Sequence, residues 1–489
     1  MKKRVWSIVL IGFMAFSLIA CGDKGGNDTQ SKDEVIENVL AEAYEGIEVQ
    51  GITEDKIYIG NATASSGEFA TVGTPFNLGL NAALKVYNDK GGYKGKVVEL
   101  VHYDDGFNAE QGLTLTKKLV EEDKVFALVG HFGTPTVAVT LDYITSDSGI
   151  PMVYAVTGIS GLYNEDAEGF EQAIMPVQPI YNTEGRILLA RAVASADSGL
   201  GLGGTKIGVI STTDEAGMGI LEGIKRQEKD IEGVTIKYVT TSDAPGTNHS
   251  SAVSALRDEG CDVIIVAANQ TPFGEIMNCM KDAGLDNVKI ITSYVSANDD
   301  FLVTLPITET REVYTTAWLD ITSATYSYEP AEDNVTGTYL WACYKALAET
   351  YGDDLADMYD AGVSGFSEEY WVAAEAICAY DLAVNGAAST TAFTNSYNAY
   401  ALAGYIAGTM FIEGLNRVEE SDKDLTWMNY IEAMESAPVD VPMGGTINLA
   451  DGSRLGTTDL ALNKFDMTKM ELVTYSGMAS LEDIMETVK

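Results

Sequence analysis

Positive charge is scarce in this sequence. Its 489 residues include 31 Lys and Arg against 72 Asp and Glu, which gives a formal net charge of −41. Long-range repulsion opposes binding to nucleic acid or to an anionic membrane surface, so neither is expected as a charge-driven partner. After the first twenty residues the sequence also lacks any apolar run long and uncharged enough to cross a bilayer.

Cysteine and histidine are few, and their spacing carries no recognisable chemistry. Four of the five cysteines are scattered without metal-ligand spacing: Cys261, Cys279, Cys343 and Cys378. We expect most or all of them to be reduced and buried, with one structural disulfide as the alternative. The three histidines make no H-E-x-x-H pattern, and no G-x-S-x-G elbow, phosphate loop or dinucleotide fingerprint occurs in its required context. We therefore expect no enzyme, no cofactor and no metal.

The N-terminus reads as a secretory leader. A basic start, Met1 to Arg4, precedes an apolar stretch that ends at Ala20, which predicts a signal peptide over residues 1–20. The residues Leu18 to Cys21 resemble the bacterial lipobox, in which the cysteine is lipidated. Acyl chains on Cys21 would hold the protein to a membrane on its extracytoplasmic face. Residues 21–51 are then the lipidated cysteine and a flexible tether, with one short helix around residues 35–44.

Beyond residue 55 the sequence alternates between short apolar runs and amphipathic stretches. Strands are expected at 57–60, 97–101, 125–129 and 151–154, with helices at 76–88 and 109–122 and from Pro135 onward. The pattern restarts with helices at 186–196, 217–230, 250–259 and 273–283, and strands at 205–210, 235–239, 262–267 and 288–291. Repeated β-α-β units predict two mostly parallel sheets, with a cleft lined by their strand ends.

The segment from Val125 to Thr136 is the centre of the first sheet. Five apolar residues, Val125 to Val129, fit a buried strand, and Gly130 ends it. Thr134 and Pro135 predict an N-cap and the first residue of a helix. A helix that starts at the carboxyl end of a strand can hold an anion, although every α/β fold also contains ordinary turns of this kind.

Several pieces of the chain, in order and spacing, resemble one known family. They are Ile57 to Gly60, Gly67, Gly73, Asn88 to Gly95, Tyr103 to Asp105, Leu128 to His131, Gly149 to Met152, Lys206 to Ile210 and Lys281 to Leu285. The chain is similar to the extracellular solute-binding proteins of ABC transporters in the Leu/Ile/Val-binding family. The resemblance covers residues 55 to 300 well, fails from about 325 to 392, and returns faintly from Tyr397 to the end.

The resemblance implies the type I periplasmic binding protein fold, an α/β fold with two lobes and three crossovers between them. Each lobe is a mostly parallel sheet flanked by helices. Lobe one is expected over 52–178 and 305–438, with an elaboration at about 325–392, and lobe two over 179–304 and 439–489. The implied function is to close around a small solute and present it to an ABC permease. The alternative is a ligand sensor that signals to a membrane receptor.

The resemblance also places binding residues in lobe one. Thr134 falls where the family holds a ligand carboxylate with a serine or threonine, and the N–H of Thr136 and the helix dipole would assist. The alternative is that Thr134 only caps the helix. The other lobe-one positions are Ser65, Ser66, Ala155, Val156 and Thr157; serines in a turn such as that of Ser65 and Ser66 are more often plain turn residues. His131 is interpreted as a buried, hydrogen-bonded histidine rather than a base.

In lobe two the candidates follow three strands: Asp214, Glu215, Asn269, Gln270 and Tyr294. Amino-acid binders of the family usually carry an acidic residue in the turn where this chain has Ser293 to Ser296, so Asp214 or Glu215 would have to hold the ligand ammonium. Otherwise the ligand is not an amino acid. Phe132, Tyr154 and Tyr294 either line an apolar slot for an aromatic or branched ligand or belong to the core.

Overall fold

The computed structural model describes residues 39–488 except 68, 245, 332, 352–363 and 387–390, so the expected signal peptide and Cys21 lie outside the described residues. Residues 39–43 are helical, as expected at this end of the N-terminal helix. Leu40 and Tyr44 are buried, and the Tyr44 hydroxyl donates to the Gly149 carbonyl oxygen at 2.5 Å. The chain is therefore attached to the protein body from about residue 39, whereas we expected a flexible tether up to residue 51.

The first sheet has five strands in the order β2-β1-β3-β4-β5, and all neighbouring pairs are parallel. The strands are β1 (Lys56–Ala62), β2 (Val97–Tyr103), β3 (Ala127–Val129), β4 (Met152–Val153) and β5 (Ile174–Met175). The helices are α2 (Ala70–Asp89), α3 (Ala109–Glu121) and α4 (Thr134–Tyr143). Strand β3 is fully buried, as its uninterrupted apolar run predicts. Because the strands are parallel, their carboxyl ends lie at one edge of the sheet.

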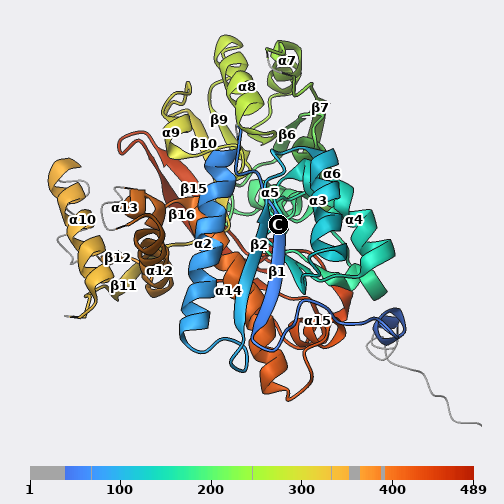
Figure 1. Ribbon diagram of the computed structural model, residues 1–489. Coiled ribbons are helices and arrows are strands. Elements are labelled where there is room, and N and C mark those ends of the chain that lie inside the picture. The colour runs from blue at the N-terminus through green and yellow to red at the C-terminus, as the bar shows by residue number, and fades with distance from the viewer. Residues whose placement is uncertain are drawn as a thin grey trace, which may run out of the picture.

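The second sheet has seven strands in the order β16-β15-β10-β9-β8-β6-β7. Its parallel strands are β6 (Lys206–Ser211), β7 (Thr235–Thr240), β8 (Val263–Ala267), β9 (Val288–Thr292) and β10 (Arg311–Ala317). The antiparallel strands β15 (Leu460–Asp466) and β16 (Glu471–Ala479) complete it. The helices are α5 (Tyr181–Val193), α6 (Glu215–Gln227), α7 (Ser250–Glu259), α8 (Gln270–Asp282), α9 (Asp299–Leu302) and α16 (Leu481–Met485). Figure 1 shows this sheet and its helices above the first sheet.

The chain passes between the two sheets three times, as expected, but two of the expected boundaries are wrong. Strand β10 pairs with β9 in the second sheet, so the second crossing follows residue 317 rather than residue 305. In the hairpin of β13 (Val439–Asp440) and β14 (Thr446–Ile447), Val439 and Ile447 are buried in the core cluster that contains the first sheet. The third crossing therefore lies near Thr457, whose N–H and hydroxyl both donate to the Val177 carbonyl oxygen in the first crossing.

Residues 322–396 form an added segment beside the first lobe, close to the elaboration expected at about 325–392. It contains β11 (Thr322–Ser327), α10 (Val335–Tyr351), β12 (Ser364–Phe366), α12 (Glu368–Asn385) and α13 (Thr391–Ser396). Its core contains packed aromatic rings. Those of Tyr328 and Trp371 stack with centroids 4.2 Å apart and planes inclined by 9°. The yellow-orange to brown elements at the left of Figure 1 are this segment.

The first lobe is completed by α14 (Ala399–Glu420) and α15 (Trp427–Glu435). The backbones of helices α14 and α2 approach so closely that the residues at their contact must be glycine. A Cβ atom on Gly404 would come within 1.8 Å of the Phe76 carbonyl oxygen, and one on Gly79 within 1.8 Å of the Ala401 carbonyl oxygen. Among the described residues, no helix, α14 included, combines the length and the apolar character needed to cross a membrane.

Candidate functional site

The start of helix α4 is built differently from its predicted form. Gly133, with φ of 91°, is the N-cap, and Thr134 is the first helical residue. Thr134 was expected to cap the helix, but its hydroxyl instead makes a 2.8 Å hydrogen bond with the hydroxyl of Thr157. Glycine takes the N-cap because few other residues adopt this left-handed backbone conformation. The Thr134 side chain is therefore released from capping.

The hydroxyls of Thr134 and Thr157 lie at the N-terminus of a helix, a position that favours anion binding. The N–H groups of Thr134 and Thr136 are in the first turn of α4, where no intrahelical acceptor exists. The pair joins the turn after β3 to the segment after β4, so the two neighbouring strand ends meet here, as expected. Ala155 and Val156 lie between the end of β4 and Thr157. The Val156 N–H donates to the His131 carbonyl oxygen at 2.8 Å.

The Thr136 side chain has a different role from its N–H. It is fully buried, and its hydroxyl donates to the buried carboxylate of Asp105. Burial raises the pKa of Asp105, although the bonds from Thr136 and from the Phe107 N–H act in the opposite direction. The Thr136 hydroxyl therefore stabilises the turn between β2 and α3. Only the backbone N–H of Thr136 is left to bind an anion.

Aromatic rings flank the hydroxyl pair. Phe132 is 5% exposed and its backbone bridges to Val156. Its ring lies 5.9 Å from that of Phe107, which stacks on Phe69 at 3.8 Å. Sequence reasoning missed Phe69 and Phe107, since they follow different strands and only the packed sheet brings them together. Phe69 is 37% exposed, so the stack reaches the surface.

Ser65 and Ser66 are exposed and are held by the neighbouring turn. Their N–H groups donate to Asp104 Oδ1 at 2.9 and 3.3 Å, and the Ser65 hydroxyl contacts His102 Nε2 at 3.1 Å. These bonds account for both serines as turn residues. Desolvation tends to raise the pKa of Asp104, but hydrogen bonds from the Ser66 side chain and from the N–H groups of Ser65, Gly106 and Ser66 hold it below its usual range.

In lobe two, Asp214 and Asn269 are bonded to each other. Asp214 caps helix α6, with Oδ1 accepting from the Gly217 N–H at 3.0 Å and from the Thr212 hydroxyl at 2.6 Å. Its Oδ2 accepts from Asn269 Nδ2 at 2.6 Å. Glu215 and Asn269 are exposed, whereas Gln270, the first residue of α8, is partly buried. The structure thus brings the ends of β6 and β8 together through this pair.

Tyr294 contacts the first crossing between the lobes. Its hydroxyl donates to the Pro179 carbonyl oxygen at 3.4 Å, and Gln178 Nε2 lies 3.5 Å from it. Burial, with nearby Tyr181, Glu184 and Tyr154, raises the pKa of Tyr294. The side chain therefore spans from lobe two to the crossing rather than extending into a free slot.

Glu184 is an acidic residue beneath this turn that sequence reasoning missed. It is fully buried in α5, and its carboxylate accepts from the Ser293 hydroxyl at 2.7 Å, the Tyr294 N–H at 3.2 Å and the Thr316 hydroxyl. Burial raises its pKa, and these bonds oppose the rise. Its donors are more than one hundred residues away along the chain, so no local pattern indicated it.

Tyr154 ends β4 in an unusual state. Its φ is 55°, it is fully buried, and its ring packs edge-on against Trp318 of the second crossing at 6.3 Å. The hydroxyl has no hydrogen-bond partner in the described part of the chain. A strained backbone and an unsatisfied buried hydroxyl at a strand end are features of functional positions.

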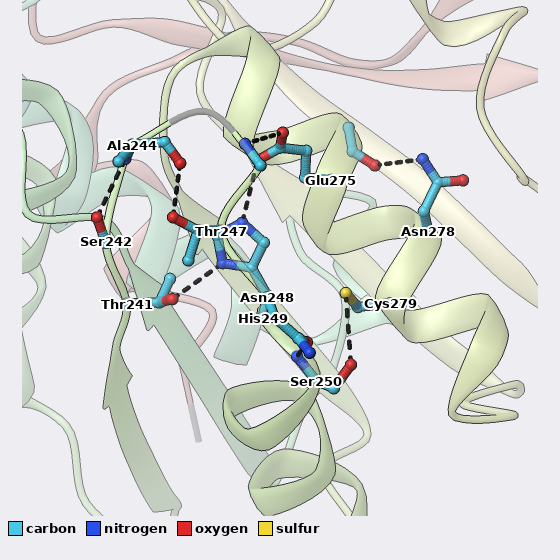
Figure 2. Close-up of polar contacts among 12 residues, drawn as sticks. Thr241, Ser242, Ala244, Thr247, Asn248, His249, Ser250, Glu275, Asn278 and Cys279 are labelled. Carbon is cyan, nitrogen blue, oxygen red and sulfur yellow. Dashed lines mark hydrogen bonds and ion pairs between the residues drawn. The ribbon is translucent and has the colours of Figure 1, made fainter.

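The histidines are structural in their contacts. His131 is fully buried, with Nε2 2.7 Å from the Thr116 hydroxyl and Nδ1 accepting from the Ala62 N–H at 3.3 Å. Burial lowers its pKa to about 4, so it is neutral at pH 7. His249 is also buried; Figure 2 shows it between Thr241, at 2.9 Å, and Glu275, at 3.4 Å. No metal-binding group of three ligands occurs among the described residues.

Comparison with known proteins agrees with this architecture. A sequence family described as periplasmic binding protein matches residues 56–379. The chain belongs to this family. Its members' fold, with two largely parallel sheets flanked by helices, is the one described above.

This chain is similar to an amino acid binding protein of Pseudomonas aeruginosa, with 25% identity over 239 residues. The matched residues are 47% of this chain and 58% of that protein. It is 22% identical over 317 residues, 63% of this chain, to a leucine-, isoleucine-, valine-, threonine- and alanine-binding protein of the same species, of which 80% is covered. A fatty acid ABC transporter substrate-binding protein from Thermomonospora curvata superposes with a TM-score of 0.59 at 16% identity, covering 91% of this chain and 98% of that one.

Proposed function

We propose that this periplasmic binding protein holds a small solute with a carboxylate or amide group, an amino acid or a similar compound, between its two lobes and delivers it to an ABC permease. The start of α4 carries the proposal. The Thr134 hydroxyl bonds that of Thr157 there, and the N–H groups of Thr134 and Thr136 belong to the first turn of the same helix. A carboxylate at this position would gain hydrogen bonds and the favourable end of the helix dipole. The hydroxyls, which now bond each other, would both donate to it.

The names of the similar proteins support a ligand with a carboxylate. Two of them are described as binding amino acids and one as binding fatty acid. These ligands differ in size and in the presence of an ammonium group, but all of them carry a carboxylate. The carboxylate is therefore the group that we expect to bind at the N-terminus of α4.

An amino acid would also present an ammonium group, which needs an anionic partner when it leaves water. Asp214 already bonds Asn269, Thr212 and the α6 backbone, and Glu184 already accepts three hydrogen bonds. Glu215 is exposed at the start of α6 beside them. We assign the ammonium to Glu215.

Delivery follows from lobe closure. A solute that contacts both lobes only when they meet shifts the open and closed populations by that difference in affinity. The three crossings are suited to hinge motion of this kind. The permease would read the closed form, and a lipid on Cys21 would keep the protein at the membrane. No observation favours the signalling alternative.

The test is ligand-induced thermal stabilisation of the purified protein. The ligands are branched-chain, aromatic and polar amino acids, short amides, and carboxylates without an ammonium. A ligand at 100 times its dissociation constant adds about 2.7 kcal/mol to the free energy of unfolding. Stabilisation by an amino acid, lost in Glu215→Gln, supports the full proposal. Stabilisation only by ammonium-free carboxylates removes Glu215 from the site, and no stabilisation contradicts the proposal.

A further inference from the structure

A cavity of about 410 Å³ lies between the added segment and helix α2. Tyr326, Tyr328 and Trp371 line it from the added segment, and Val86 lines it from α2. None of the residues proposed above for solute binding lines this cavity. Its chemistry therefore calls for an explanation of its own.

The cavity combines aromatic rings with one negative charge. Glu375 is the single charged side chain among the described residues that line it. Its carboxylate accepts from the Tyr328 hydroxyl and from Asn334 Nδ2, the latter at 2.7 Å. None of the described residues that line the cavity is Lys, Arg or His. These two neutral donors orient the carboxylate but do not neutralise it. A carboxylate among aromatic rings attracts a cation, through charge and through the ring faces.

We propose that this cavity is a second binding site, for a small organic ammonium ion. The ammonium lies against Glu375 and the ring of Tyr326, and its alkyl groups contact Val86 and Val372. The excess of acidic residues over the whole chain, 72 against 31 basic, raises the local concentration of such a cation. The site is independent of the solute site between the lobes.

The test is calorimetric titration of the purified full-length protein with choline as the probe. Its neutral carbon analogue, 3,3-dimethylbutan-1-ol, has the same shape and hydroxyl without the charge. We expect choline to bind and the analogue to bind about tenfold more weakly or not at all. Absence of choline binding, or equal binding of the analogue, overturns the proposal.

Two pairs of variants locate the binding. Glu375→Gln should weaken choline binding about tenfold, whereas Glu329→Gln, which removes the same charge from a nearby exposed position, should not. Val372→Lys places a cation at the edge of the cavity and should abolish binding. Val384→Lys is its control, because Val372 and Val384 are 53% and 60% exposed on the same helix and only Val372 lines the cavity. Both lysine variants are surface changes that leave the fold intact.

Equal loss in Val372→Lys and Val384→Lys, or unchanged binding in Val372→Lys, contradicts a site in this cavity. Solute-induced thermal stabilisation should survive in all these variants, so the two proposals fail separately.

Discussion

Thr134 shows how a side chain becomes available for a ligand at the scale of one residue. Gly133 caps the helix, so the threonine hydroxyl is free to bond Thr157 and, in our proposal, a carboxylate. The sequence singled out this residue as a candidate for ligand binding, and its predicted role as the helix N-cap was wrong. A threonine and a glycine at adjacent positions are both acceptable caps, and only the backbone angle decides between them.

Replacing Thr134 with alanine should weaken solute binding about tenfold, which is the typical effect of losing one hydrogen bond to a charged group. The fold should be unaffected, because the hydroxyl does not cap the helix. Calorimetric titration measures the affinity, and Thr134→Ser should restore it. Thr114→Ala, on the exposed face of α3, is a control that should bind normally. Unchanged affinity in Thr134→Ala would remove this residue from the site.

His131 should make stability depend on pH. Burial lowers its pKa to about 4, below the value of about 6.5 in an unfolded chain. Between these values the unfolded state binds more protons, so the stabilising contribution is complete above pH 6.5 and is lost as the pH falls towards 4. The loss amounts to roughly 3 kcal/mol.

Urea unfolding at pH 7 and pH 4.5 measures this dependence. His131→Gln should be less stable overall, because its bonds to Thr116 and Ala62 change, but its stability should fall less between the two pH values. The comparison therefore concerns the change with pH. An equal fall in both proteins would show that other groups cause it.

At the scale of elements, helices α2 and α14 depend on close approach of their backbones. The sequence predicted a helix at 76–88, within α2, but gave no structural reason for Gly79. Contact with a helix more than three hundred residues further along the chain explains them, since Gly79 and Gly404 lie where a Cβ atom would overlap a carbonyl oxygen. The positions of glycines within one helix do not show which other helix packs against them.

Gly404→Ala should lower the free energy of unfolding by about 3 kcal/mol, because the added methyl group forces α14 away from Phe76. Gly477→Ala on β16 is the matched control, because a Cβ atom there meets nothing within 4 Å. It should change stability by less than about 0.5 kcal/mol. Equal effects of the two substitutions would mean that helix packing does not limit stability here.

At the scale of the whole molecule, the remaining prediction concerns where the protein resides. If Cys21 carries the lipid, Cys21→Ser should move the protein from the membrane fraction to the soluble extracytoplasmic fraction while leaving solute binding unchanged. Fractionation and mass measurement of the N-terminal peptide check this. A variant that stays with the membrane would contradict anchoring through Cys21.

The sequence by itself determined the alternation of strands and helices, the two largely parallel sheets and the family, because hydrophobic periodicity and local turn residues act over a few positions. It also identified the strand ends that face the proposed site. Tertiary structure decided what lies at those ends. Glu184 bonds the turn of Tyr294, Phe69 stacks on Phe107, and β10 joins the second sheet. These contacts join residues distant in the chain, and their energy depends on packing that no local pattern encodes.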